Sequence, residues 1–236
     1  MKASALKKSL IAMIDSKIPV FVWGSPGVGK SSLIKQIAND KSMEFIDLRL
    51  SLLDPTDLRG IPFFDATNKS AVWAKPEFLP DTNSQSFGVL FLDEINSAPP
   101  TIQAAAYQLI LDRKIGEYTL PINYAIVAAG NYESDRGVTY RMPTPLANRF
   151  VHLDFELDFS EWKSWAYESK IDNRIISFLS YKPQNLFTFD TKSKEKSFAT
   201  PRSWSFVNDI LNSNLQIEFL KDVISGAVGI ESSDEF

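Results

Sequence analysis

The stretch that decides the fold is Trp23-Gly-Ser-Pro-Gly-Val-Gly-Lys-Ser-Ser32. It ends a run of residues with high strand propensity that starts at Ile18, and a helical pattern begins after it. Residues 24–31 match G-x-x-x-x-G-K-[ST], the pattern of a loop that surrounds phosphate groups, and a strand before and a helix after are the setting that this loop requires. The stretch therefore predicts a phosphate-binding loop; a glycine-rich turn without a ligand is the alternative.

Each residue type in this loop has a chemical role. Glycines let backbone N–H groups turn toward anionic oxygens, and the N-terminus of the next helix adds its positive end. Lys30 is suited to neutralising charge on the β- and γ-phosphates, and the Ser31 hydroxyl is a ligand for Mg²⁺. The residues predicted to bind the nucleotide are Gly24, Ser25, Pro26, Gly27, Val28, Gly29, Lys30, Ser31 and Ser32.

A pair of acidic residues ends the buried-strand pattern Phe87-Gly-Val-Leu-Phe-Leu-Asp93-Glu94. Because the carboxyl ends of parallel strands share one edge of a sheet, we expect Asp93 beside the phosphate loop, where it can hold Mg²⁺. Glu94 then faces the γ-phosphate and serves as the base that orients and deprotonates an attacking water. The alternative is that the two acids only cap the next helix.

Two further candidates lie next to later strand patterns, and the first of them is expected at the same edge. Asn131 directly follows the strand pattern that ends at Gly130, and its amide is suited to bind the attacking water or the γ-phosphate; a turn asparagine is the alternative. Arg149 precedes the last strand pattern, and its guanidinium can stabilise transition-state charge, including that in a neighbouring subunit. Arg136 and Arg141 lie nearby in sequence, so charge alone does not select Arg149, and a surface salt bridge is the alternative.

A further candidate lies in the C-terminal part of the chain. Thr200 and Pro201 have the residue types of an N-cap and a first helical position. A helix that starts there is expected to present Arg202 toward the nucleotide, unless Arg202 is an ordinary surface residue. The predicted catalytic residues are therefore Lys30, Glu94, Asn131 and Arg149; Arg202 joins the nucleotide-binding residues, and Ser31 and Asp93 are the predicted metal ligands.

Helical and strand-like patterns alternate along residues 1–156, which predicts an α/β nucleotide-binding domain. Apolar residues at helical spacing indicate helices over about 3–15, after the phosphate loop and after Pro100. The strand patterns are Ile18–Trp23, Met43–Leu48, Phe87–Asp93, Ile122–Ala129 and Val151–Phe155, the last of them nearer an edge. Their apolar runs favour a parallel sheet covered on both faces, a three-layer sandwich.

Two segments depart from this alternation. Residues 54–81 are rich in proline and indicate an insertion with a hairpin or a long loop, whose aromatic residues Phe63, Phe64 and Trp73 either contact a partner or pack onto the parent domain. From residue 157 to 236 only helical patterns occur, which predicts a small α-helical domain. We expect its aromatic residues in the core rather than as platforms for stacked bases: Trp162, Trp165, Tyr167, Phe178, Tyr181, Trp204 and Phe206.

Composition limits the class of protein. The chain has 236 residues, no cysteine and a formal net charge of −4, and its one histidine, His152, cannot form a metal cluster and is interpreted as structural. Without cysteines there is no disulfide framework or zinc ribbon, and without a basic tract nucleic-acid binding is disfavoured. No apolar run is long enough to span a membrane and no signal-peptide pattern opens the chain, so we expect a cytoplasmic protein without membrane insertion.

Taken in order, these motifs resemble the AAA+ ATPases, and within them the MoxR-like and dynein-related group. Residues 24–31 look like the Walker A motif of that family and Val89–Glu94 like its Walker B, while Asn131 resembles sensor 1, Arg149 the arginine finger and Arg202 sensor 2. The stretches at 47–60 and 93–103 support the narrower assignment, and the resemblance covers about residues 5–230.

The resemblance implies a five-stranded parallel sheet in the order 5-1-4-3-2, a helical lid, and ATP and Mg²⁺ as cofactors. It also implies a homo-oligomer, usually a hexameric ring, in which Arg149 acts on the ATP of the neighbouring subunit and Arg202 within its own. Members of the group use ATP hydrolysis to remodel partner proteins as chaperones do, often beside a von Willebrand A-type protein. Two residues depart from the pattern of the family. Asn148 stands where an Asp commonly precedes the arginine finger, and Ser97 stands where an Arg often follows the Asn of the Walker B stretch.

Three functional hypotheses follow from the residues and the resemblance. The leading one is an ATP-hydrolysing remodeller of partner proteins. The second is an ATP-dependent assembly switch or adaptor with little turnover, against which the intact Glu94 and Arg149 argue. The third is a motor subunit associated with nucleic acid, which the acidic net charge disfavours.

Overall fold

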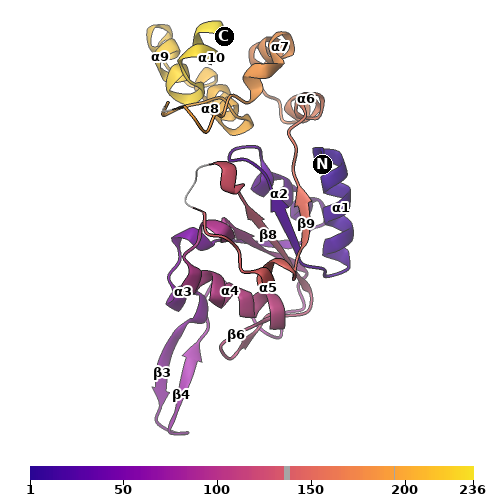
Figure 1. Cartoon of the computed structure of the whole chain (residues 1–236), viewed down its shortest axis with the longest axis vertical. Coiled ribbons are helices and arrows are strands. Elements are labelled where there is room, and N and C mark those ends of the chain that lie inside the picture. The colour runs from indigo at the N-terminus through magenta and orange to yellow at the C-terminus, as the bar shows by residue number, and fades with distance from the viewer. Residues whose placement is uncertain (136–138, 194) are drawn as a thin grey trace. The chain divides into compact units, whose positions relative to one another are not determined.

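The computed structural model describes residues 1–135, 139–193 and 195–236, and these form two compact units. The first unit comprises Met1, Ala5–Gly24 and Lys30–Phe155. The second comprises Lys2–Ser4, Ser25–Gly29 and Glu156–Phe236. Figure 1 labels the helices of both units and those strands for which there is room.

A five-stranded sheet forms the centre of the first unit, and every neighbouring pair in it is parallel. Its strands are β1 (Val20–Trp23), β2 (Glu44–Arg49), β5 (Gly88–Asp93), β8 (Tyr124–Gly130) and β9 (Val151–Asp154). They lie in the order β2-β5-β8-β1-β9. Numbered among themselves along the chain, these strands have the order 5-1-4-3-2, so the expected topology is confirmed, with β9 at an edge.

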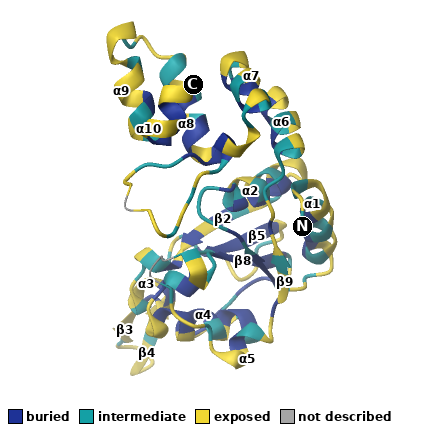
Figure 2. Cartoon of the chain, turned by 45° about the horizontal axis from the view of Figure 1, so that its top comes forward, coloured by how far each residue is buried: buried dark blue, intermediate teal, exposed yellow. Residues whose placement is uncertain are grey.

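Helices cover both faces of this sheet, because alternate residues of the buried strands point to opposite sides. Leu90 and Leu92 share one core cluster with Ala105 and Leu109 of α4 (Pro100–Asp112). The intervening residues of β5 are also fully buried, on the face where α1 (Ala3–Asp15) and α2 (Lys30–Asp40) lie in Figure 2. The first unit is therefore the expected three-layer α/β sandwich.

The proline-rich insertion contains a short helix and a hairpin. Helix α3 (Pro55–Arg59) precedes strands β3 (Ile61–Asp65) and β4 (Ser70–Ala74), which pair with each other and with no other strand in the described part of the chain. The hairpin extends away from the central sheet in Figure 1. Phe63 is 52% exposed and Phe64 is 70% exposed. Packing of these two rings onto the parent domain, one of the two expectations, is therefore wrong.

Several short elements of the first unit escaped the sequence analysis because each has too few residues for a periodic pattern. A second hairpin, β6 (Lys114–Ile115) and β7 (Tyr118–Thr119), follows α4. The helix α5 (Thr144–Ala147) stands before β9. Three 3-10 helices are η1 (Leu50–Leu52), η2 (Ile95–Ser97) and η3 (Glu133–Asp135).

The second unit is helical after Glu156, as expected. Its elements are α6 (Phe159–Glu168), α7 (Asn173–Tyr181), the 3-10 helix η4 (Pro183–Leu186), α8 (Pro201–Leu211), α9 (Ile217–Val228) and α10 (Ile230–Glu235). Helix α10 was not expected, because its six residues include only one large apolar side chain. Thr200 is the N-cap of α8 and forms a capping box with Ser203, so the expected start of that helix is confirmed.

Aromatic side chains build much of the core of this second unit. Trp162 and Trp204 are buried, and Trp204 contacts both Phe178 and Phe236 with ring centroids 5.6 and 5.5 Å apart. The expectation of core packing is wrong for three others, since Tyr167, Tyr181 and Phe206 are exposed. Those three lie on the outer faces of their helices, a distinction that residue type alone does not make.

Candidate nucleotide site

The register of the sheet brings the ends of two strands together at its carboxyl edge. Trp23, the last residue of β1, is the partner of Gly130, the last residue of β8. The residues that follow, Gly24 and Asn131, therefore leave the sheet side by side. In the loop after Gly24, Gly27 has a φ of 78° and Gly29 a φ of 103°. Other residues rarely adopt these angles, so the two glycines are required by the backbone.

Lys30, the first residue of α2, joins these two strand ends through its ammonium group. The side chain is only 8% exposed, and its Nζ donates to the Gly24 carbonyl at 2.5 Å and to the Asn131 Oδ1 at 2.9 Å. A buried ammonium needs such oxygen partners, because leaving the charge unpaired costs several kcal/mol. The arrangement brings a positive charge and an amide together at the carboxyl edge of the sheet.

Asp93 ends β5, the strand next to β8, and so reaches the same edge. Burial raises the pKa of this carboxyl group, the positive charge of Lys30 lowers it, and the neighbouring Asp47 raises it again. Lys30, Asp93 and Asn131 were expected at one edge of the sheet, and the structure brings all three there.

Glu94 adopts a left-handed backbone conformation with a φ of 55°, which is uncommon for a residue other than glycine. Its amide donates to the Asp93 Oδ1 at 3.0 Å, and its Oε2 accepts from the Ser51 hydroxyl at 2.5 Å. Backbone outliers of this kind cluster at functional sites because the surrounding structure has to hold them. The alternative was that Asp93 and Glu94 only cap the next helix; the Glu94 side chain makes no capping hydrogen bond to η2, and the N-cap of α4 is Pro99.

Two residues at this edge were missed by the sequence analysis. Ser51 lies in η1, just beyond β2, so the rule that polar residues after strands meet at one edge would have found it. Asn96 lies in η2, two residues after Glu94, and its Nδ2 donates to the Asn131 carbonyl at 2.7 Å. Asn96 lies in the stretch 93–103 that supports the family resemblance, but no role in the site was predicted for it.

The candidate arginines have different settings. Arg149 is exposed and follows α5, where its amide donates to the Leu146 carbonyl at 3.0 Å. Among the residues that the structure describes, no carboxylate lies within ion-pair distance of Arg149. Arg141 is also exposed, whereas Arg136 lies outside the described residues. Arg202 belongs to the second unit, on the exposed face of the first turn of α8.

The donor set at the carboxyl edge suits Mg²⁺ bound together with a nucleotide. Mg²⁺ prefers oxygen ligands and is commonly held by one or two protein groups, with water and phosphate oxygens completing its coordination. The Ser31 hydroxyl in the first turn of α2 and the Asp93 carboxylate are ligands of this type. Within the described ranges there is no group of three or more His, Cys, Asp or Glu that could hold a metal without such help.

His152 has a structural role, as expected. Its Nδ1 accepts from the Trp23 indole at 2.9 Å, and its Nε2 lies 2.8 Å from the Ala147 carbonyl. The first bond leaves the proton on Nε2, which then donates to that carbonyl. Both ring nitrogens are thus used to fasten β9 to its neighbours.

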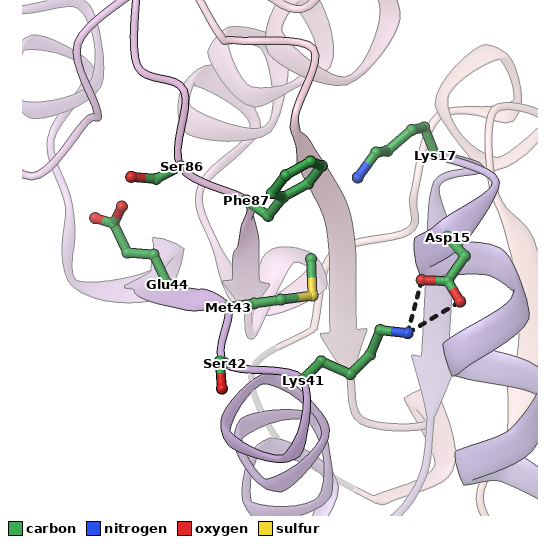
Figure 3. Close-up of a pocket in the computed structure, with 8 residues that line it drawn as sticks. All are labelled: Asp15, Lys17, Lys41, Ser42, Met43, Glu44, Ser86 and Phe87. Carbon is green, nitrogen blue, oxygen red and sulfur yellow. Dashed lines mark hydrogen bonds and ion pairs between the residues drawn. The ribbon is translucent and has the colours of Figure 1, made fainter.

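A cavity of about 570 Å³ lies at the opposite, amino end of the strands, where α1 and α2 also end (Figure 3). Lys41 pairs there with Asp15 at 2.9 Å, and Lys17 donates to the Asn123 carbonyl at 3.1 Å. Burial is the main cause that lowers the pKa of Lys17, whose ammonium lies 5.6 Å from the centre of the Phe87 ring. None of the residues that line this cavity belongs to the phosphate-loop motif or to the acid pair, so it is not assigned as the nucleotide site.

Residues 19–152 match the family model described as "ATPase family associated with various cellular activities (AAA)". The matched segment covers more than half of the chain and contains every candidate of the first unit. The chain belongs to this AAA family. Over 145 residues, or 57% of its length, this AAA chain is also 30% identical to midasin from Dictyostelium discoideum. The match covers 2% of midasin, so the chain spans a small fraction of that relative.

Solved structures agree with the AAA fold. A mutant of RuvB from Thermotoga maritima superposes with a TM-score of 0.53 at 19% identity, covering 99% of this chain and 68% of that chain. A protein from Cytophaga hutchinsonii gives 0.53 at 18% identity, covering 98% of this chain and 67% of that chain. At these identities the likeness concerns the fold alone. Within the described part of the AAA chain, no helix has the length and apolar character needed to cross a membrane.

Proposed function

We propose that the chain binds MgATP at the carboxyl edge of its sheet and hydrolyses it, as a MoxR-like member of the AAA family. The observation that carries the proposal is the bond from Lys30 to Asn131, beside the acid pair Asp93-Glu94. It supports a site in which a cation, an amide and two carboxylates converge where a γ-phosphate would lie. Membership of the AAA family supports the same reading.

Each residue has a defined part in this mechanism. Residues 24–32 surround the phosphates, Ser31 and Asp93 hold Mg²⁺, and Lys30 neutralises negative charge. Glu94 takes a proton from the attacking water while Asn131 orients that water, so the water attacks as hydroxide develops. Mg²⁺ supplies further charge neutralisation at the phosphate oxygens.

We further propose that the active form is a homo-oligomer, a hexameric ring, in which Arg149 of one subunit stabilises charge at the ATP of the next. The support is the exposed position of Arg149 on a short turn that the buried Phe150 anchors. Arg202 would bind the nucleotide of its own subunit. The ring would remodel a protein substrate or a von Willebrand A-type partner in the cytoplasm, as members of the MoxR-like group do.

The decisive experiment compares the wild-type protein with Glu94→Gln. Wild-type protein is expected to hydrolyse ATP only with Mg²⁺, and its specific activity should rise with protein concentration. Glu94→Gln should bind ATP with similar affinity and lose most turnover, because the amide cannot accept the proton of water. Equal turnover by the two proteins would refute the assignment of Glu94.

One alternative keeps the site but not the turnover. An assembly switch would bind ATP and change its mass in solution without hydrolysis in a single-turnover assay. A nucleic-acid motor would instead show strong, salt-sensitive stimulation by DNA. The net charge of −4 favours neither DNA binding nor a surface that tracks phosphates.

A further inference from the structure

Asn96 is a buried amide that links the two loops of the candidate site. The side chain is 1% exposed and belongs to η2, which begins directly after Glu94. Its Nδ2 donates to the Asn131 carbonyl at 2.7 Å, and its backbone carbonyl accepts from the Tyr140 amide at 2.6 Å. Asn96 therefore contacts the chain on both sides of the segment that follows β8.

The backbone around Asn96 is shaped to admit this amide. A Cβ atom on Gly130 would lie 2.3 Å from the Asn96 Oδ1 and 2.7 Å from the Phe21 ring. Only glycine leaves room at that position for the side chain to lie against the strand end. The close approach is thus a property of two residues that are far apart in sequence.

The amide is retained at a cost. Among the described groups, the Asn96 Oδ1 is buried and has no hydrogen-bond partner. An unsatisfied buried oxygen costs about 1–3 kcal/mol, so packing alone would favour a small apolar residue here. The donor half of the side chain must therefore do something that an apolar residue cannot do.

We propose that Asn96 is a positioning residue for hydrolysis: by fixing the Asn131 backbone, it sets the Asn131 amide and the bound Lys30 ammonium in register with Glu94. This inference rests on the proposed ATP hydrolysis. Asn96 and Glu94 share one short turn, and Asn96 is bonded to Asn131. A shift of that turn therefore moves the Glu94 carboxylate and the Asn131 amide together. The two groups that meet the attacking water then keep their spacing.

The test is a double-mutant cycle measured in steady-state ATP hydrolysis. Asn96→Ala should lower kcat about 10- to 100-fold, since misplacement by about 1 Å has effects of this size, while KM for ATP changes less than about threefold. Asn131→Ala alone should also lower kcat. If Asn96 acts through Asn131, the double variant should be no slower than Asn131→Ala, whereas independent roles would multiply the two losses.

A matched control is Gln103→Leu. The Gln103 amide is also buried in the first unit and donates to the backbone carbonyl of Ala98 at 3.0 Å, which lies outside the bonds that hold Asn131. It should lower the thermal midpoint without changing kcat. Hydrogen exchange gives a second readout: Asn96→Ala should speed exchange around Asn131, and Gln103→Leu should not.

The outcomes separate the inference from the function that it serves. Wild-type protein without hydrolysis would overturn both. Active wild-type protein with an unchanged kcat in Asn96→Ala, or a double variant that multiplies the losses, would overturn the role of Asn96 alone. Should Asn96→Ala fail to fold, Asn96→Asp keeps the shape, lacks the N–H donors and is expected to give the same loss.

Discussion

At the scale of the single residue, Lys30 bonds to the protein backbone and side chains and is also the proposed ligand of the phosphates. Its ammonium is held by the Gly24 carbonyl and the Asn131 Oδ1, so in the proposed site it would be oriented before a phosphate binds. A charge that is already in place loses less side-chain entropy on binding than a mobile surface lysine. The oxygen acceptors around Lys30 therefore favour binding of an anion, because they hold the ammonium in place beforehand.

Lys30→Met tests this duty directly. Hydrogen bonds to charged groups contribute about 1.5–3 kcal/mol, so the affinity for ATP should fall about 10- to 100-fold. Titration with a fluorescent ATP analogue measures the change. Lys35→Met, on the exposed face of the same helix, is the control and should bind ATP as the wild-type protein does. Equal losses in both variants would contradict a specific role for Lys30.

Substitution by alanine is expected to have opposite effects on stability at two glycines. Gly130→Ala should destabilise the first unit by about 1–3 kcal/mol, because the new Cβ meets Asn96 and Phe21 in a packed interior. Gly226→Ala should instead stabilise α9 by up to about 1 kcal/mol, since apart from the adjacent residues and the nearby backbone of the helix no described atom lies within 4 Å of the new Cβ, and alanine favours helix. Urea unfolding of the two variants measures both. A neutral Gly130→Ala would refute the close packing at that strand end.

Among the secondary-structure elements, the β3–β4 hairpin stands apart because both of its faces are exposed. Opposite residues share a face, so Phe63 lies with Val72 on one side and Pro62 with Trp73 on the other. A two-stranded hairpin without a covering layer is only marginally stable in water. Its aromatic side chains therefore contribute little to the stability of the parent unit.

Replacing Phe63 and Phe64 with serine should change the free energy of unfolding by less than about 0.5 kcal/mol, as for other surface substitutions. Phe21 is a fully buried residue of β1, and Phe21→Ala should cost about 3–5 kcal/mol in the same urea titration. A large loss in the hairpin variant would mean that these rings pack against the domain in solution.

The start of α6 predicts a dependence of stability on pH. Asp158 is its N-cap, and the hydrogen bond from Lys2 is the first cause that holds the pKa of this carboxyl below its usual range. A lowered folded-state pKa stabilises the fold above the unfolded pKa of about 3.9, and that stability disappears as the pH falls below it. Asp158→Ala should therefore lower the thermal midpoint at pH 7 and have a progressively smaller effect toward about pH 2. A difference that stays constant over this range would contradict the assignment.

At the scale of the whole molecule, the proposed role of Arg149 involves the nucleotide site of a neighbouring subunit. Arg149 is exposed, so its guanidinium is available to a second copy of the chain. If it acts in trans, Glu94→Gln and Arg149→Ala should each be inactive, and mixing them should restore activity. At random assembly about a quarter of the interfaces then pair an intact Glu94 with an intact Arg149. Absence of any recovery would place Arg149 outside the site. In the control mixture, Arg141→Ala takes the place of Arg149→Ala.

Local chemistry determined much of this fold from the sequence alone. The spacing of the glycines and Lys30 in the phosphate loop, the apolar strand runs and the cap at Thr200 each depend on residues that are neighbours in the chain. They predicted the strands and the main helices to within a few residues, and they predicted which polar groups follow which strands. The strand order came from the resemblance to a family, because periodicity does not encode which strands pair.

Only the tertiary structure decided how the polar groups meet. Lys30 and Asn131 are 101 residues apart, Ser51 and Glu94 are 43 apart, and Asn96 and Asn131 are 35 apart. Each contact exists because parallel strands place their carboxyl ends at one edge, which is a consequence of long-range pairing. The exposure of Phe64 was decided in the same way, since burial depends on whether another element covers a strand, and no local pattern specifies that.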